Sequence, residues 1–204
     1  MLKVIKKYRK FITFLMIGLV YTLAYPATAH AMHIMEGMLP PRWCIFWYAV
    51  SLPFFIYGLY RMYKIVNSGV PNAKVMLALC GAFVFVLSSL KLPSVTGSCS
   101  HPTGVGLGTV LFGPGVMSVL GVIVLLFQAL LLAHGGITTL GANVLSMGII
   151  GPLCGYAVWL GLRKLNVNDE IAMFFTAFVA DLMTYVVTAI ELSLAFPKPD
   201  FFTA

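Results

Sequence analysis

Residues 116–133 of the chain read VMSVLGVIVLLFQALLLA, an apolar run of 18 residues without a charged side chain. An α-helix rises about 1.5 Å per residue, so this run would extend roughly 27 Å, close to the ~30 Å hydrocarbon thickness of a bilayer. The run therefore predicts a helix that crosses a membrane and indicates an integral membrane protein.

The composition of the whole chain leads to the same conclusion. Of the 204 residues, 60% are apolar and only 9% are charged, whereas a soluble domain carries about 25% charged residues. So few charged side chains cannot cover the surface of a water-soluble globule of this size. A soluble protein and a separate soluble domain are both excluded.

Hydropathy places further apolar segments on both sides of this run. One of them, residues 104–114, is rich in glycine and too short to cross a bilayer unaided. We therefore expect an all-α integral membrane protein, a bundle of about six transmembrane helices, one of them short and glycine-rich. Besides 104–114 and 116–133, the expected spans are 43–60, 75–92, 143–162 and 171–196.

The first 31 residues are typical of a secretory signal peptide. A basic stretch, residues 1–10, precedes an apolar stretch, residues 11–25, which ends at Pro26 and the small-residue tripeptide Ala29-His30-Ala31. We expect cleavage after Ala31, which would leave residues 32–204 as one membrane-embedded domain. The alternative is an uncleaved anchor, but 15 apolar residues would span only about 22 Å.

The formal charge of +7 comes mostly from the leader, which holds five of the 13 basic residues. From Met32 onward the net charge is +2, and no basic stripe interleaved with aromatic residues indicates nucleic-acid binding. With the mature amino terminus outside a cell (plasma) membrane, more basic residues fall inside than outside, as the positive-inside rule requires. The expected inner residues are Arg61, Lys64, Lys74, Arg163 and Lys164; the outer ones are Arg42, Lys91 and Lys198.

A mature chain that begins Met32-His33 offers three nitrogen atoms in succession to a metal ion. They are the α-amine of Met32, the backbone nitrogen of His33 when deprotonated, and Nδ1 of the His33 ring. Such a planar chelate suits Co(II), Ni(II) or Cu(II) better than Zn(II) or Mg(II). His101, in a loop on the same predicted side, could complete a square of four nitrogens. The predicted metal site is therefore Met32, His33 and His101.

Structural roles remain open for these and other polar residues. His33 could be incidental near a terminus, and His101 could be a loop histidine that bonds only to backbone. His134 is also expected on the outer side, without an assigned role. Asp181 and Glu191 lie within the last expected span, where acids either form functional sites or hydrogen-bond between helices.

Other function classes find little support in the sequence. It contains no Gly-x-Ser-x-Gly or His-Glu-x-x-His motif, so a hydrolase is not expected, and we interpret the protein as a non-enzyme. No nucleotide-phosphate motif occurs either, so any ATP would be hydrolysed by another subunit. A proton- or cation-coupled secondary carrier would use Asp181 and Glu191, but the inverted repeats typical of such carriers are not evident.

Four motifs in the same order resemble the CbiM family, the cobalt-specific substrate-binding (S) components of energy-coupling-factor (ECF) transporters. They are AMHIMEG (31–37), VTGSCSHPTGVGLG (95–108), QALLLAHGG (128–136) and LGAN (140–143). The resemblance implies an S-component fold that captures Co(II) through Met32, His33 and His101. It also implies a transmembrane coupling protein, two cytoplasmic ATPases and a small accessory membrane protein as partners. The nickel homologue, NikM, is the nearest alternative.

The sequence departs from this family in one respect. Family members usually carry a further span after the segment that matches residues 169–196, whereas this sequence ends at Ala204. Such a span would be expected to help close the helix bundle.

Overall fold

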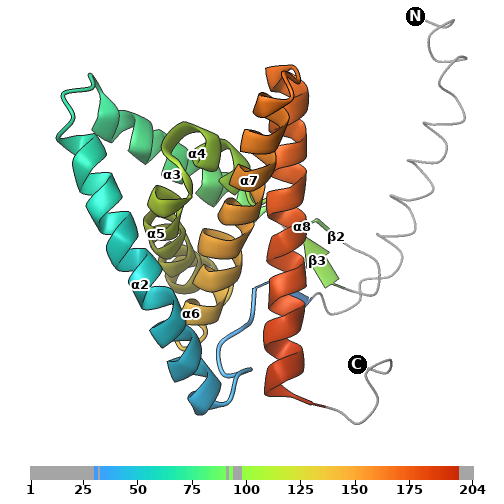
Figure 1. Cartoon of the computed structure of the whole chain (residues 1–204). Helices are drawn as coiled ribbons and strands as arrows, with labels where there is room; N and C mark the ends of the chain where they lie inside the picture. Colours follow the sequence, from blue (N-terminus) through green and yellow to red (C-terminus); the bar gives the residue numbers. More distant parts are fainter. Residues whose placement is uncertain (1–29, 32, 91, 94–97, 198–204) are drawn as a thin grey trace, which may run out of the picture.

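A computed structural model describes residues 30–31, 33–90, 92–93 and 98–197 of the chain. The predicted leader up to residue 29 and Met32 lie outside the described residues. Helices dominate, with three short strands between them (Figure 1). In chain order the elements are β1 (His30–Ala31), α2 (Pro41–Val66), α3 (Ala73–Ser89), β2 (Leu92–Pro93), β3 (Ser98–Ser100), α4 (Val105–Phe112), α5 (Pro114–Leu132), α6 (Leu140–Asn143), the π-helical segment η2 (Val144–Ile150), α7 (Gly151–Lys164) and α8 (Asp169–Ala195).

Within the described residues, four helical stretches are long and apolar enough to cross a membrane. They are Pro41–Val66, Pro114–Leu132, Leu140–Lys164 and Asp169–Ala195. The prediction of a helical, multi-pass membrane protein is confirmed, and each of the six expected segments is helical. The count of six crossings is not confirmed, because α3 has only 17 residues and α4 only eight. Eight residues extend about 12 Å, too short for a bilayer.

Local sequence explains several helix ends. Pro41 and Pro114 occupy the first helical positions of α2 and α5, where the missing N–H costs nothing. The side chain of Asn168 caps α8 by accepting a hydrogen bond from the Glu170 N–H at 3.0 Å. Gly113, with φ +84°, lies alone between α4 and α5. Its left-handed backbone lets the chain reverse there, so α4 returns directly into the long helix α5.

The interior of the protein centres on η2 and α5. Residues 144–149 of η2 are all buried, and this segment joins α6 to α7 without a break. Close approach of the two backbones requires small residues, since a Cβ on Gly121 of α5 would lie 2.9 Å from the Gly148 Cα. The outer helix faces are strongly apolar and exposed, for example at Leu131 and Phe174. Such a surface is suited to contact with lipid.

Two segments from the outer side of the expected topology lie on either side of α8 in Figure 1. The segment before α2 runs down between α6 and α8 to the start of α2, and β2 and β3 lie to the right of α8, beside its middle. β3 pairs in parallel with β1, with His30 opposite Ser98, and antiparallel with β2. The loops therefore reach into the bundle and do not remain at its end.

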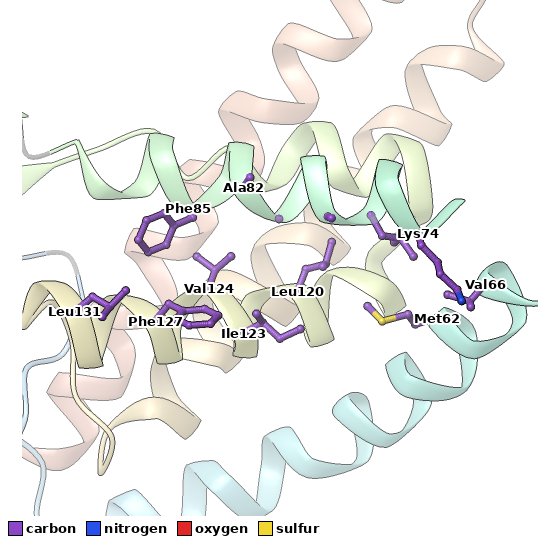
Figure 2. Close-up of a pocket in the computed structure, with 13 residues that line it drawn as sticks. Met62, Val66, Lys74, Ala82, Phe85, Leu120, Ile123, Val124, Phe127 and Leu131 are labelled. Atoms are coloured by element: carbon purple, nitrogen blue, oxygen red, sulfur yellow. The ribbon is translucent and has the colours of Figure 1, made fainter. Parts of the chain in front are cut away.

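An apolar groove of about 560 Å³ lies between α3 and α5 (Figure 2). Phe85 and Leu131 line one end, and Met62, Val66 and Lys74 line the other. Among its lining residues only Lys74 is ionisable, and a cationic ammonium has no lone pair for a metal ion. The groove is therefore not the predicted metal site.

Candidate metal centre

Three histidine rings meet in the interior, each from a different part of the chain. His33 comes from the segment before α2, His101 from the loop before α4, and His134 from the turn after α5. His33 Nδ1 lies 2.9 Å from His134 Nε2 and 3.3 Å from His101 Nε2. The third side, between His101 Nε2 and His134 Nε2, is also 3.3 Å. The three nitrogens form a compact triangle.

The size of this triangle fits a single transition-metal ion. An ion about 2.0–2.1 Å from each nitrogen would see neighbouring ligands roughly 90–110° apart. The three side chains are 2–3% exposed, so they are held inside the protein. Since all three would be neighbouring ligands of one ion, further coordination positions would remain open.

The segment that carries His33 is held by side chains near the start of the third long helical stretch. The Ile34 N–H donates to Asn143 Oδ1 at 2.8 Å, and Asn143 Nδ2 donates back to the Ile34 carbonyl at 3.0 Å. The Thr139 hydroxyl donates to the same carbonyl at 2.7 Å. The side chain of Asn143 thus bonds to both the N–H and the carbonyl of Ile34, as the backbone of a neighbouring β-strand would.

A second attachment lies two residues further along. The Thr138 N–H donates to Glu36 Oε2 at 3.0 Å. Hydrogen bonding to Thr138 lowers the pKa of Glu36, so its carboxylate stays ionised. The backbones are also close, because a Cβ on Gly136 would lie 2.6 Å from the Glu36 Cα. The glycine is needed for this segment to lie where it does.

The ring of His33 has a partner on the side away from the cluster. Its Nε2 lies 3.3 Å from the Sδ of Met147, a fully buried residue of η2. A thioether sulfur can only accept a hydrogen bond, so the bond to Met147 forms when the proton is on Nε2. The lone pair of Nδ1 then points toward His101 and His134, which is the state a metal ion requires.

The other two rings are positioned by the loops that carry them. The His101 N–H donates to the Tyr185 hydroxyl of α8 at 3.2 Å, and its ring stacks on His33 with centroids 5.1 Å apart. His134 follows Ala133, whose left-handed backbone (φ +47°) ends α5, and its N–H donates to the Gln128 carbonyl at 3.2 Å. The end of α5 therefore directs His134 inward.

The electrostatics of the cluster favour neutral imidazoles. Burial lowers the pKa of His33 well below its usual value, and the charges that His101 and His134 would carry lower it further. Burial, followed by the influence of His134, lowers the pKa of His101 to about 4. Neutral imidazole is the form that binds metal ions.

The structure brings the predicted residues His33 and His101 together. Met32 lies outside the described residues, so its amine as a ligand, and the square of four nitrogens, remain predictions. Both histidines are buried, although one lies near the predicted terminus and the other in a loop, because the terminal segment and the loop insert into the bundle. His134 was not predicted as a ligand. The feature of the sequence that could have indicated it is its expected position on the same side of the membrane as His33 and His101.

Asp181 and Glu191 have different surroundings. Asp181 Oδ1 accepts hydrogen bonds from both the N–H and the hydroxyl of Thr103, in the loop of His101. Glu191 is 1% exposed, and its carboxyl oxygens have no hydrogen-bond partner in the part of the chain that the structure describes. Asp181 is thus engaged by the loop that carries a histidine of the cluster.

Comparison with known proteins gives a consistent set of relatives. Residues 33–204 match a family model described as "Cobalt uptake substrate-specific transmembrane region". The cobalt transport protein CbiM of Limosilactobacillus reuteri is 84% identical over 200 residues, which cover 98% of this chain and 81% of that protein. The cobalt transport protein CbiM of Salmonella typhimurium is 58% identical over 177 residues, covering 87% and 72%.

A solved structure described as a truncated transition metal transporter shares the fold. Its TM-score is 0.73 at 29% sequence identity, with 82% of this chain and 78% of that chain covered.

Proposed function

Because the chain belongs to the CbiM family of cobalt-uptake membrane proteins, we propose that it is the substrate-binding subunit of an ATP-driven importer of the ECF type, with Co(II) as its substrate. The observation that carries this proposal is the cluster of His33, His101 and His134, whose ring nitrogens lie 2.9–3.3 Å apart. The relatives are named as transport proteins, and the chain is a transport component with no enzymatic role of its own.

The proposed ligands are the Met32 amine, the backbone nitrogen and Nδ1 of His33, and Nε2 of His101. Neighbouring corners of a square around one ion are about 2.9 Å apart for bonds of about 2.0–2.1 Å, so His101 Nε2, now 3.3 Å from His33 Nδ1, would move slightly closer on binding. His134 Nε2 is close to both and would approach as an additional ligand.

The amine exists only if the leader is removed between Ala31 and Met32, which makes residues 32–204 the mature metal-capture domain. Its amino terminus would lie on the outer face of the plasma membrane. ATP would be hydrolysed by cytoplasmic ATPase subunits, as the family resemblance implies. A transmembrane coupling component and a small accessory membrane subunit would complete the importer.

Titration of the purified mature chain with Co(II) tests the proposal, with amino-terminal sequencing as the check on the leader. We expect one ion per chain, a start at Met32, and loss of most binding in His33→Ala and His101→Ala. Insertion of one alanine before Met32 moves the imidazole from second to third place and should cause comparable loss. A chain that starts elsewhere, or an insertion variant that binds Co(II) normally, would refute the amine chelate.

Nickel is the second candidate substrate. Nitrogen ligands bind Ni(II) more tightly than Co(II) in the general affinity order of divalent metals. Uptake assays in cells that hold the partner subunits separate the two: nickel uptake without cobalt uptake would make the chain a NikM-type component and leave the site unchanged.

A further inference from the structure

His101 differs from His33 in what holds its ring in its orientation. The Nδ1 of His101, which faces away from the cluster, makes no hydrogen bond within the described ranges of the chain. A metal-binding histidine normally donates its second N–H to an acceptor that fixes the ring, as Met147 does for His33. Apart from the contacts of its ring with His33 and His134, the position of His101 therefore depends on how its backbone is held.

Two residues of α8 hold that backbone. The Tyr185 hydroxyl accepts the His101 N–H at 3.2 Å. Asp181 Oδ1 accepts the Thr103 N–H at 3.0 Å and the Thr103 hydroxyl as well. Asp181 and Tyr185 are four residues apart and so lie on one face of α8. The loop is thus attached to a single helix on both sides of Pro102.

Thr103 also joins this attachment to α4. Its hydroxyl oxygen accepts the Val105 N–H at 3.4 Å, one of the first N–H groups of α4, which have no acceptor within the helix. Thr103 is fully buried, so water does not substitute for these bonds. The side chain of Asp181 therefore fixes the loop and, through it, the start of α4.

We infer that Asp181 and Tyr185 are positioning residues that hold His101 in place to bind the transported ion, with Thr103 as the link between Asp181 and the loop. The inference rests on the proposed function, because it requires that His101 is a ligand. It assigns Asp181 a role different from ion or proton coupling: the carboxylate accepts hydrogen bonds from the loop and does not contact the ion.

The arrangement has a consequence for release of the ion. Asp181 lies near the middle of α8, roughly 18 Å along the helix from its first residue. His33 is instead tied to η2 through Met147. Movement of α8 relative to η2 would therefore separate His101 from His33. Without such movement, weakening the attachment leaves His101 less firmly positioned and should speed dissociation of Co(II).

The test uses pairs of substitutions in the purified full mature chain. Thr103→Val removes the hydroxyl at constant shape and Tyr185→Phe removes the acceptor for His101, whereas Thr103→Ser and Asp181→Asn keep an oxygen in place. We expect Thr103→Val, Tyr185→Phe and Asp181→Leu to release Co(II) about 10- to 100-fold faster. Their Co(II) visible absorption spectra should also change, and Thr103→Ser and Asp181→Asn should behave as the parent.

Thr176→Val is the matched control, since Thr176 is an equally buried threonine of α8 whose hydroxyl donates to the Ala172 carbonyl of its own helix. It should leave the dissociation rate and the spectrum unchanged. Asp181→Leu can fail to fold, but Thr103→Val and Tyr185→Phe each remove a single polar group and decide the question without it.

Failure of the inference is distinguishable from failure of the proposed function. A parent chain that binds no Co(II) refutes the function. If His101→Ala abolishes binding while Thr103→Val and Tyr185→Phe keep the parent rate and spectrum, the function stands and the positioning role is refuted. A Thr103→Ser variant as impaired as Thr103→Val would also overturn it, because the hydroxyl would not be the group that matters.

Discussion

The Nε2 of His33 and the Sδ of Met147 lie 3.3 Å apart although 114 residues separate them in the chain. This contact favours the tautomer of His33 with its proton on Nε2, because sulfur has no hydrogen to donate. It also ties the terminal segment to η2, the most buried part of the bundle. The tautomer of a candidate ligand is thus favoured by a residue that would not touch the ion.

Replacing Met147 with Leu should weaken Co(II) binding by about tenfold, because the ring would lose the acceptor that orients it while the volume stays similar. Isothermal titration of the purified chain measures this. Met147→Gln supplies an amide oxygen as acceptor and should restore most of the affinity. Met117→Leu is the control, since Met117 is equally buried and packs near Gly108. Parent affinity in Met147→Leu would contradict the assignment.

Replacing His134 with Ala should reduce Co(II) affinity about 10- to 100-fold and change the visible spectrum, since one of three imidazoles within 3.3 Å of one another would be lost. The comparison is with His33→Ala, for which we expect a greater loss because the His33 imidazole closes a chelate ring with the backbone nitrogen, which alanine alone cannot do. If affinity and spectrum are both unchanged in His134→Ala, this histidine is not a ligand and serves only to position His33.

Selectivity against zinc should depend on the Met32 amine. The planar chelate with the amine disfavours Zn(II), whereas three imidazoles alone form the kind of set that zinc accepts. We expect the mature chain to prefer Co(II) and Ni(II) to Zn(II), and a chain with an acetylated amine to lose that preference. Competition titrations measure both. Strong Zn(II) binding by the unmodified chain would refute the planar nitrogen site.

Gly136→Ala should displace the terminal segment, since its Cβ would lie 2.6 Å from the backbone of Glu36. We expect a loss of about 1–3 kcal/mol in stability and weaker Co(II) binding, because His33 lies three residues before Glu36. Gly161→Ala is the control, as a Cβ there has no atom within 4 Å. Thermal unfolding in detergent and Co(II) titration report the two effects, and identical behaviour of both variants would contradict the expected contact.

The ion-free protein should lose stability as the pH falls from about 6.5, the ordinary histidine pKa. The loss should continue toward pH 4, because burial lowers the pKa of His101 to about 4. In this range the unfolded chain binds protons that the buried rings of His33 and His101 do not, so protonation favours unfolding. Melting temperatures recorded across this range measure the effect. His101→Ala should flatten the dependence; a profile unchanged by that substitution would show that the ring does not contribute.

Hydropathy predicted the helices well, because a helix in lipid must be apolar along its whole length; the expected span 116–133 corresponds to α5 at Pro114–Leu132. It did not predict the burial of His33. That burial depends on bonds such as Ile34 to Asn143, between residues 109 apart, which no local pattern encodes. His134 was missed as a candidate ligand for a different reason, since its inward direction follows from the left-handed backbone of Ala133, which a residue with a Cβ rarely adopts.

The π-helical turns of η2 hold more residues per turn than an α-helix, and such turns arise when one residue is inserted into an α-helix. If the same residues were wound as a regular α-helix, the extra residue would no longer be absorbed, and Asn143 would rotate by about 100° relative to α7. Asn143 would then leave Ile34, and the terminal segment would lose its attachment. The number of residues in η2 is therefore constrained, whereas the number in the exposed turn at residues 67–72 is not. Among functional relatives, insertions and deletions should be absent from η2 and tolerated in this turn.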